Sequence, residues 1–289
     1  GALHRAGGTG GERRPRMRKI GIDVGGTTLK LGVVENDRDI IDRDTRPSPH
    51  DPEEMAATLY DMILAARKRF GMLPAAISTA GEIDGEGNIT ANQLGFSKAP
   101  VGSELFRRLG ERIPIENDGI CALVAEHTAG ALKGYDSALM STLGTGIGGG
   151  VIADGKPYRG FRGAHAELGH MITHVGGKPC SCGQRGCLEA VIADRLLHSG
   201  GVMTREVLNY LSIGIATAIN ICDIGCAVMV GSYVDQMTPA QRDELSRLIR
   251  DKVTGPHLRE LELFFSDQTR ELTLSGMCTY TFDRYFSVD

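Results

Sequence analysis

The stretch IGIDVGGTTLKLGVVEND, residues 20–37, contains an apolar strand, a glycine turn and a second strand that returns beside the first. Residues 140–155, MSTLGTGIGGGVIADG, repeat this order and close on a similar polar turn. Because both halves of the chain begin with the same strand, glycine turn and strand, the sequence indicates an internal duplication. Because glycine lets backbone amides approach a ligand, two facing turns of this kind are suited to cradle a polyphosphate. Two structural hairpins without a ligand are the alternative.

The elements between and after these turns favour an α/β protein over a dinucleotide-binding one. Residues 40–46 predict a third strand, residues 52–70 carry apolar side chains at helical spacing, and residues 75–79 predict a short buried strand. Residues 144–148 carry glycine at alternate positions, as in a dinucleotide fingerprint, but that motif opens a helix. Residues 150–153 predict a strand instead, which disfavours dinucleotide binding.

The composition is that of a globular protein and favours a small-molecule ligand over nucleic acid. The 289 residues suffice for about two domains, and 32 Lys and Arg against 36 Asp and Glu leave a net charge of −4. This balance provides no basic surface for nucleic acid. No apolar run is long enough to cross a bilayer and the N-terminus lacks a signal-peptide core, so we expect a cytoplasmic protein without a membrane partner. Residues 1–16 are expected to be a tag or disordered extension.

Three of the seven cysteines lie within eight residues, in the stretch CSCGQRGC at residues 180–187. In a chain with this expected location, such spacing favours a metal over disulfides. Tetrahedral zinc needs a fourth ligand, for which His170 is the first candidate and His174 the second. The expected ligands of this closed, structural zinc site are Cys180, Cys182, Cys187 and His170. The alternative is a set of buried structural cysteines.

Motifs in a fixed order carry a family resemblance over residues 17–234. They are DVGGT at residues 23–27 with Lys30, END at 116–118, LGTGIGGG at 143–150, and ELGH at 167–170 leading to the cysteine stretch and Glu189. Because spacing, order and chemistry agree, the chain resembles the ROK family (repressor, open reading frame, kinase), which includes zinc-containing bacterial glucokinases and N-acetylhexosamine kinases.

The resemblance implies an α/β, actin-like ATPase fold, which is a duplicated ribonuclease-H-like fold of two domains around a central cleft. We expect a small α/β domain of residues 17–115 plus 276–289, and a large α/β domain of residues 116–275 that carries the zinc loop. ATP would lie across both hairpins and the sugar deeper in the cleft. A homodimer is the expected assembly.

The implied activity is that of an ATP-dependent hexose kinase that phosphorylates the 6-hydroxyl of glucose or a related hexose or N-acetylhexosamine. Phosphoryl transfer needs a carboxylate to accept the hydroxyl proton, donors for the phosphates, and Mg²⁺. The resemblance assigns the carboxylate to Asp118, although Asn117-Asp118 alone would be interpreted as a helix cap. The expected ATP and Mg²⁺ residues are Asp23, Gly25, Gly26, Thr27, Lys30, Thr145 and Gly146. Lys30 could equally face phosphate or solvent.

A sugar requires several polar side chains that converge in one cleft. The positions that match the family's sugar contacts are Gly81, Asn92, Asn117, Asp118, Glu167, His170 and Glu189. His170 would have two tasks, because one ring nitrogen can bind zinc while the other meets a sugar hydroxyl. Zinc would then be structural in its bonding and necessary for activity.

The chain departs from the family pattern at several positions. Ile120 stands where the family usually has an amide, Ala91 replaces a proline before Asn92, and Gly231 is followed by serine instead of glycine. The segment 190–204 is shorter than the family's helical insertion. Ile120 and the altered sequence at Gly231 favour an alternative, a non-catalytic sugar-sensing protein similar to the family's repressors without a DNA-binding domain. The presence of both Asp23 and Asp118 favours the kinase, because sugar binding alone does not need a metal-binding carboxylate.

Overall fold

The computed structural model describes residues 18–35, 39–144, 146–160, 166–255 and 261–266. The predictions for the N-terminal extension, for Thr145 and for the return of residues 276–289 to the first domain lie outside these described residues.

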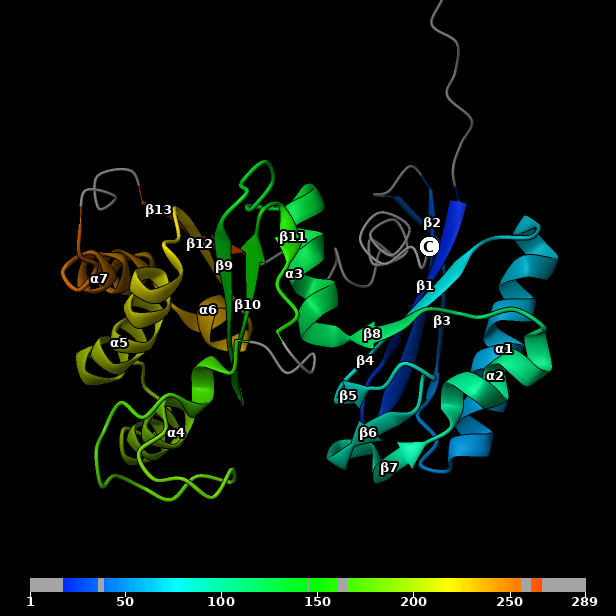
Figure 1. The fold of residues 1–289 in the computed structure, drawn as a ribbon, viewed down its shortest axis with the longest axis horizontal. Helices are drawn as coiled ribbons and strands as arrows, with labels where there is room; N and C mark the ends of the chain where they lie inside the picture. The colour runs from blue at the N-terminus through cyan, green and yellow to red at the C-terminus, as the bar shows by residue number, and fades with distance from the viewer. Residues whose placement is uncertain (1–17, 36–38, 145, 161–165, 256–260, 267–289) are drawn as a thin grey trace, which may run out of the picture.

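The N-terminal lobe is built on a five-stranded sheet of order β3-β2-β1-β4-β8. β1 (Arg18–Val24) pairs antiparallel with β2 (Thr28–Glu35), which pairs antiparallel with β3 (Asp39–Pro47). On its other side β1 runs parallel to β4 (Ala75–Thr79), which runs parallel to β8 (Ile115–Asn117). The predicted glycine hairpin is confirmed as the centre of this sheet (Figure 1).

Two helices cover this sheet. α1 (Pro52–Phe70) begins where the Asp51 side chain accepts hydrogen bonds from two amides of the first turn, and Met55, Leu59 and Ile63 bury its apolar side. α2 (Val101–Leu109) packs beside α1. A small separate sheet and a short 3₁₀ helix lie between β4 and α2: β5 (Glu82–Ile83), β6 (Ile89–Ala91), η1 (Asn92–Leu94) and β7 (Phe96–Ala99).

The C-terminal lobe repeats this plan with the strand order β11-β10-β9-β12-β13. β9 (Ala138–Leu143) and β10 (Ile147–Ala153) form the second hairpin, and β11 (Lys156–Pro157) extends it. β12 (Cys226–Val230) and β13 (Glu262–Ser266) run parallel to β9. In both lobes an antiparallel hairpin continues into two parallel strands, so the predicted duplication is present in the sheet topology.

Helices cover both faces of the second sheet, which explains why every residue of β12 is buried. α3 (Asp118–Ala129) covers one face, and helices that follow the cysteine stretch cover the other (Figure 1). The elements after β11 are η2 (Leu168–His170), α4 (Leu188–His198), α5 (Arg205–Cys222), α6 (Ser232–Gln236) and α7 (Pro239–Arg250).

The described chain crosses between the lobes at Asn117 and Asp118, where β8 of the first sheet ends and α3 begins. α3 approaches β10 closely because Gly150 has no side chain. A Cβ atom at Gly150 would lie 2.8 Å from Cδ2 of Leu123, a fully buried residue of α3. The glycines of the second hairpin therefore serve helix packing as well as any ligand.

We expect Gly150→Ala to lower the free energy of unfolding by about 1–3 kcal/mol, because the methyl group overpacks the contact with Leu123. Gly225→Ala is the matched control, since a Cβ atom there meets no atom within 4 Å. It should change stability by less than about 0.5 kcal/mol. Chemical denaturation of both variants measures the difference. Equal stability of the two variants would contradict the close approach of α3 to β10.

Candidate active site and metal centre

A cavity of about 360 Å³ opens between the two lobes. Its lining from the N-terminal lobe includes Gly81, Glu116 and Asn117, and its lining from the C-terminal lobe includes Thr142 and Glu167. Asp118, at the crossing, also lines it. Four of the predicted sugar-binding residues therefore meet in one cavity: Gly81, Asn117, Asp118 and Glu167.

The Asn117 side chain holds the centre of this cavity in place. Its Oδ1 accepts hydrogen bonds from the amides of Gly119 (2.9 Å) and Ile120 (3.3 Å) and so caps α3. Its Nδ2 donates to the carbonyl oxygen of Gly81 at 3.0 Å. The helix cap that the sequence offered as an alternative is present, and the capped helix presents Asp118 to the cavity.

Asp118 is the first residue of α3, and its surface is open to the cavity. The protein around the carboxylate displaces water and raises its pKa above the usual value, and the negative charge of Asp23 raises it further. A hydrogen bond from the Gly119 amide (2.9 Å) opposes this rise. A carboxylate with a raised pKa at the edge of a cavity is suited to accept a proton.

Asp23 lies near the end of β1, beside the first glycine turn, and burial raises the pKa of its carboxyl group. Lys30 opposes this rise through its charge, and the Ser78 hydroxyl opposes it by donating to Oδ1 at 3.5 Å. The register pairs Asp23 directly with Lys30, so both side chains lie on one face of the hairpin. The structure thus places Lys30 beside the predicted magnesium-binding carboxylate.

The glycine turns stand at the ends of both hairpins. In the first, the Gly25 amide donates to the carbonyl oxygen of Thr28 at 3.0 Å, which tightens the turn around Gly26 and Thr27. In the second, the Gly144 amide donates to the Gly146 carbonyl oxygen at 3.0 Å.

Glu189 supports the second turn from α4. Its Oε2 accepts a hydrogen bond from the Ile147 amide at 2.8 Å. Glu189 was predicted as a sugar contact, and the structure connects it to the second hairpin, which the sequence predicts to bind phosphate. The bond spans 42 residues of sequence, so no local pattern indicates it.

The remaining predicted sugar residues, Asn92, His170 and Glu189, are not among the residues that line this cavity. Asn92 begins η1 and is exposed. His170 ends η2, and its Nε2 lies 3.8 Å from Oε2 of the cavity residue Glu167. Thr142 and Arg159 line the cavity although the sequence did not indicate them. Thr142 Oγ1 accepts from the Gly148 amide at 3.0 Å, and no motif surrounds Arg159.

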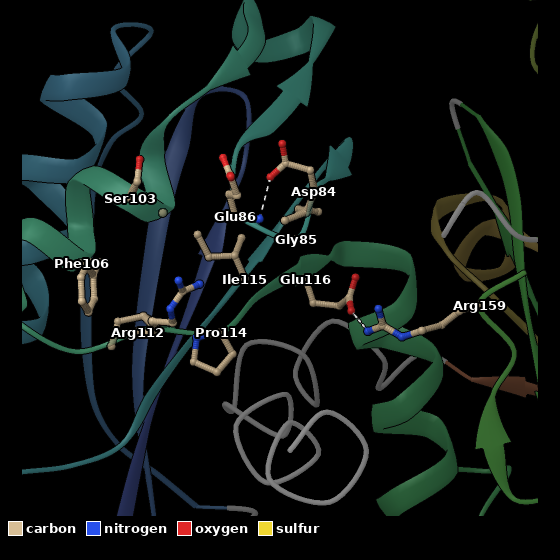
Figure 2. Close-up of a pocket in the computed structure, with 14 residues that line it drawn as sticks. Asp84, Gly85, Glu86, Ser103, Phe106, Arg112, Pro114, Ile115, Glu116 and Arg159 are labelled. Atoms are coloured by element: carbon tan, nitrogen blue, oxygen red, sulfur yellow. Dashed lines mark hydrogen bonds and ion pairs between the residues drawn. The ribbon is translucent and has the colours of Figure 1, made fainter. Parts of the chain in front are cut away.

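A second cavity of about 580 Å³ adjoins the first and shares Ile83, Glu116 and Arg159 with it. Figure 2 shows the Glu116 and Arg159 side chains pointing toward one another between the two lobes. Phe106 and Arg112 lie on its opposite side, where the guanidinium carbon of Arg112 is 5.8 Å from the centre of the Phe106 ring.

The cysteine stretch folds into a cluster with His170. The donor atoms of His170, Cys180, Cys182 and Cys187 all lie within 4.8 Å of one another. Cys180 Sγ is 3.6 Å from His170 Nδ1, and Cys182 Sγ is 3.6 Å from Cys187 Sγ. The Gly186 backbone has φ of +79°, and a Cβ atom there would collide with the His174 carbonyl oxygen, so the loop can close only with glycine.

The donor set fits zinc. One imidazole nitrogen and three sulfur atoms match a closed tetrahedral structural site. Hydrogen bonding from the Cys182 amide lowers the pKa of Cys180 to about 7, whereas burial raises that of Cys187 to about 12. His174, the second candidate for the fourth ligand, lies outside the cluster and bonds the Tyr210 hydroxyl through Nδ1 at 2.9 Å.

Among the described residues, no helix is both long enough and apolar enough to span a bilayer.

Comparison with known proteins gives one consistent result. Residues 19–200 match the model of the ROK family. Glucokinase of Thermotoga maritima is 36% identical over 182 residues, which cover 61% of this chain and 57% of that enzyme. N-acetyl-D-glucosamine kinase of Citrobacter koseri is 31% identical over 189 residues, covering 61% of this chain and 62% of that enzyme. These matches therefore span less than two thirds of both enzymes.

The fold also has a close counterpart among solved structures. The ROK hexokinase of Thermus thermophilus superposes with a TM-score of 0.78 at 27% identity and covers 93% of this chain and 99% of that one. The predicted actin-like fold of two α/β lobes is thereby confirmed.

The cysteine cluster predicts that the purified protein holds about one zinc ion per chain. We expect Cys182→Ser to lose the metal and to lower the melting temperature, because a structural zinc site contributes to folding free energy. Cys222→Ser removes an exposed cysteine outside the cluster and should retain both properties. Metal analysis with thermal unfolding tests this. Full zinc content in Cys182→Ser would contradict the ligand set.

The raised pKa of Asp118 predicts that Asp118→Asn stabilises the fold at neutral pH. A carboxyl group whose folded pKa exceeds its unfolded pKa contributes stability below the unfolded value and loses it as pH rises through the folded value. Asparagine cannot ionise and keeps the acceptor for the Gly119 amide. The gain should shrink as pH falls below the folded pKa, as measured by melting temperature against pH.

Asp84→Asn is the matched control with the opposite sign. Hydrogen bonds from the Asn88 side chain and amide lower the pKa of Asp84, so its ionised form stabilises the folded state. This variant should be less stable than the wild type at neutral pH, and the difference should vanish in acid. If both substitutions lower stability at neutral pH, the surroundings of Asp118 do not raise its pKa, and the prediction is wrong.

Proposed function

Since the chain belongs to the ROK family, we propose that it is an ATP-dependent hexose kinase. It would transfer the γ-phosphate of ATP to the 6-hydroxyl of glucose or a related hexose or N-acetylhexosamine, in line with its resemblance to a glucokinase and an N-acetyl-D-glucosamine kinase. The observation that carries the proposal is the pair Asp23 and Asp118. Their charges interact between the first glycine turn and the start of α3.

Asp118 would act as the general base. As the sugar hydroxyl oxygen forms a bond to the γ-phosphorus, the bond from that phosphorus to the bridging oxygen of ADP breaks, and the hydroxyl proton passes to Asp118. The raised pKa of Asp118 supports this role, because a base whose pKa lies closer to neutral pH is a better proton acceptor. The exposed face of Asp118 toward the cavity leaves room for the hydroxyl group.

The two hairpins would bind ATP. Amides of Gly25 and Gly26, with the hydroxyl of Thr27, would donate to phosphate oxygens from one side, and Thr145 and Gly146 from the other. The Asp23 carboxylate is suited to hold Mg²⁺ through water. When bound, Mg²⁺ would neutralise the charge that develops on the phosphates. Lys30, paired with Asp23 across the hairpin, would add positive charge on the same face.

The sugar would lie in the cavity of about 360 Å³. Glu167 and Asp118 offer acceptors there, and Asn92, Asn117 and Glu189 are proposed contacts from the surrounding elements. His170 would face the zinc ion with Nδ1, which lies beside Cys180, and the sugar side with Nε2, which lies toward Glu167. This arrangement supports the proposal that zinc orients a sugar contact. The homodimer and the cytoplasmic location stay predictions.

A non-catalytic sugar-sensing protein is the second candidate, and Ile120 is the observation that favours it. Ile120 lines the cavity with only 1% of its surface exposed, so it offers the sugar no polar atom where the family usually has an amide. Such a protein would bind the sugar without consuming ATP.

The first experiment is ADP release from Mg-ATP with glucose, N-acetylglucosamine, N-acetylmannosamine, allose and fructose. We expect turnover with at least one of these sugars and a fall in kcat of about 10²–10⁴-fold in Asp118→Asn, because the general base is lost. Asp61→Asn replaces an exposed carboxylate on α1 and should leave kcat unchanged. If calorimetry shows that the wild type binds a sugar but no turnover is measured, the kinase proposal is wrong and the sugar-sensing protein is favoured.

A further inference from the structure

One ion pair connects the two lobes beside the proposed base. Glu116 ends the N-terminal lobe together with Asn117, and only 7% of its surface is exposed. Its Oε2 pairs with the guanidinium group of Arg159, which follows β11 of the C-terminal lobe (Figure 2). Its Oε1 accepts a hydrogen bond from the Asn117 amide at 2.8 Å. One carboxylate therefore contacts both the opposite lobe and the residue before Asp118.

Arg159 is held in this position by its own lobe. The preceding residue, Tyr158, donates its amide to the Val151 carbonyl oxygen at 2.8 Å, which ties the segment to β10. The Arg159 side chain is 46% exposed and lies in the wall of both cavities. Asp84 and Glu86 also line the larger cavity, but Glu116 is the acidic residue paired with Arg159 there.

The ion pair lies beside the point where the chain passes from one lobe to the other. Among the described residues, the chain passes between the lobes once, at Asn117 and Asp118. Any rotation of one lobe against the other must change backbone torsions there, and with them the direction of the Asp118 carboxylate. The ion pair between Arg159 and Glu116 joins the lobes one residue from this crossing, where it is placed to oppose such a rotation.

We propose that Arg159 is a positioning residue, which acts through Glu116 and Asn117 to hold Asp118 in the orientation needed for phosphoryl transfer. The inference rests on the proposed function, because the group it positions is the proposed base. Arg159 itself touches neither the hydroxyl nor the phosphate in this role. Small errors in the placement of a catalytic group are costly, since a displacement of about 1 Å can lower a rate about 10²-fold.

The test compares Arg159→Met, Arg159→Lys, Glu116→Gln and the double variant Arg159→Met with Glu116→Gln. We expect each of the two charge-removing variants to lower kcat by about 10–100-fold while KM for the sugar changes by less than about threefold. The double variant should lose no more than either single one, because both act through one contact. Arg159→Lys keeps the charge and should recover a large part of kcat.

Arg205→Met is the matched control, because it breaks an ion pair with Glu244 (3.0 Å) on the surface of the C-terminal lobe. It should leave kcat unchanged. A rise in KM with constant kcat in Arg159→Met would show direct sugar binding and overturn the proposal. The proposal is also overturned if the fold-losses of kcat in the two single variants multiply in the double variant. A lower melting temperature with unchanged kcat in Arg159→Met would overturn it as well.

Hydrogen exchange separates failure of this inference from failure of the proposed function. Amide exchange over residues 115–121 is measured without substrate in the wild type, in Arg159→Met and in Arg205→Met. Faster exchange in Arg159→Met alone supports the restraint at the crossing, even if the wild type phosphorylates none of the sugars. Equal exchange in all three proteins overturns the restraint, even if the wild type is an active kinase.

Discussion

The side chain of Asn117 is the contact on which the rest of the site depends. Its oxygen caps α3 and its nitrogen binds the Gly81 carbonyl group, so one amide joins the end of β8, the loop after β4 and the first helix of the second lobe. Both polar atoms of the side chain therefore bond protein groups, and Nδ2, which carries two protons, can also donate to a ligand. The position of Asp118 follows directly, because a helix capped by one residue must present the next residue at its first turn.

The charges of Asp23 and Asp118 explain why the site needs contacts that stabilise carboxylates. Asp23 and Asp118 both have raised pKa values, and each is placed where water is partly displaced. Two desolvated carboxylates of like charge repel one another and weaken the fold when both are ionised. The compensating contacts are Lys30 opposite Asp23 and the Gly119 amide beside Asp118. A magnesium ion held by Asp23, as proposed, would offset part of this repulsion.

Features that depend on residues close together in the chain are predicted well from the sequence. Residues 52–70 and 75–79 form the expected helix and strand, because apolar spacing and the Asp51 cap act within a few residues. The cysteine spacing likewise predicted the cluster with His170. Contacts set by strand order were out of reach: Arg159 meets Glu116 over 43 residues, and Glu189 meets Ile147 over 42. Such pairs depend on how two sheets face each other, which no local pattern encodes.

The cysteine cluster and the second glycine turn are joined through the first turn of α4. Cys187 is fully buried and immediately precedes α4, and Glu189, in the first turn of that helix, accepts the Ile147 amide. The Leu188 amide donates to the Met171 carbonyl oxygen at 2.8 Å, next to His170. A single residue, Leu188, therefore separates the sulfur-bearing Cys187 of the cluster from the carboxylate that supports the turn. A loop rich in glycine would not hold Glu189 in place by its own conformational preference. A zinc ion held by the four residues, as proposed, would supply that restraint, and a site with no open coordination position would then steady the turn proposed to bind phosphate.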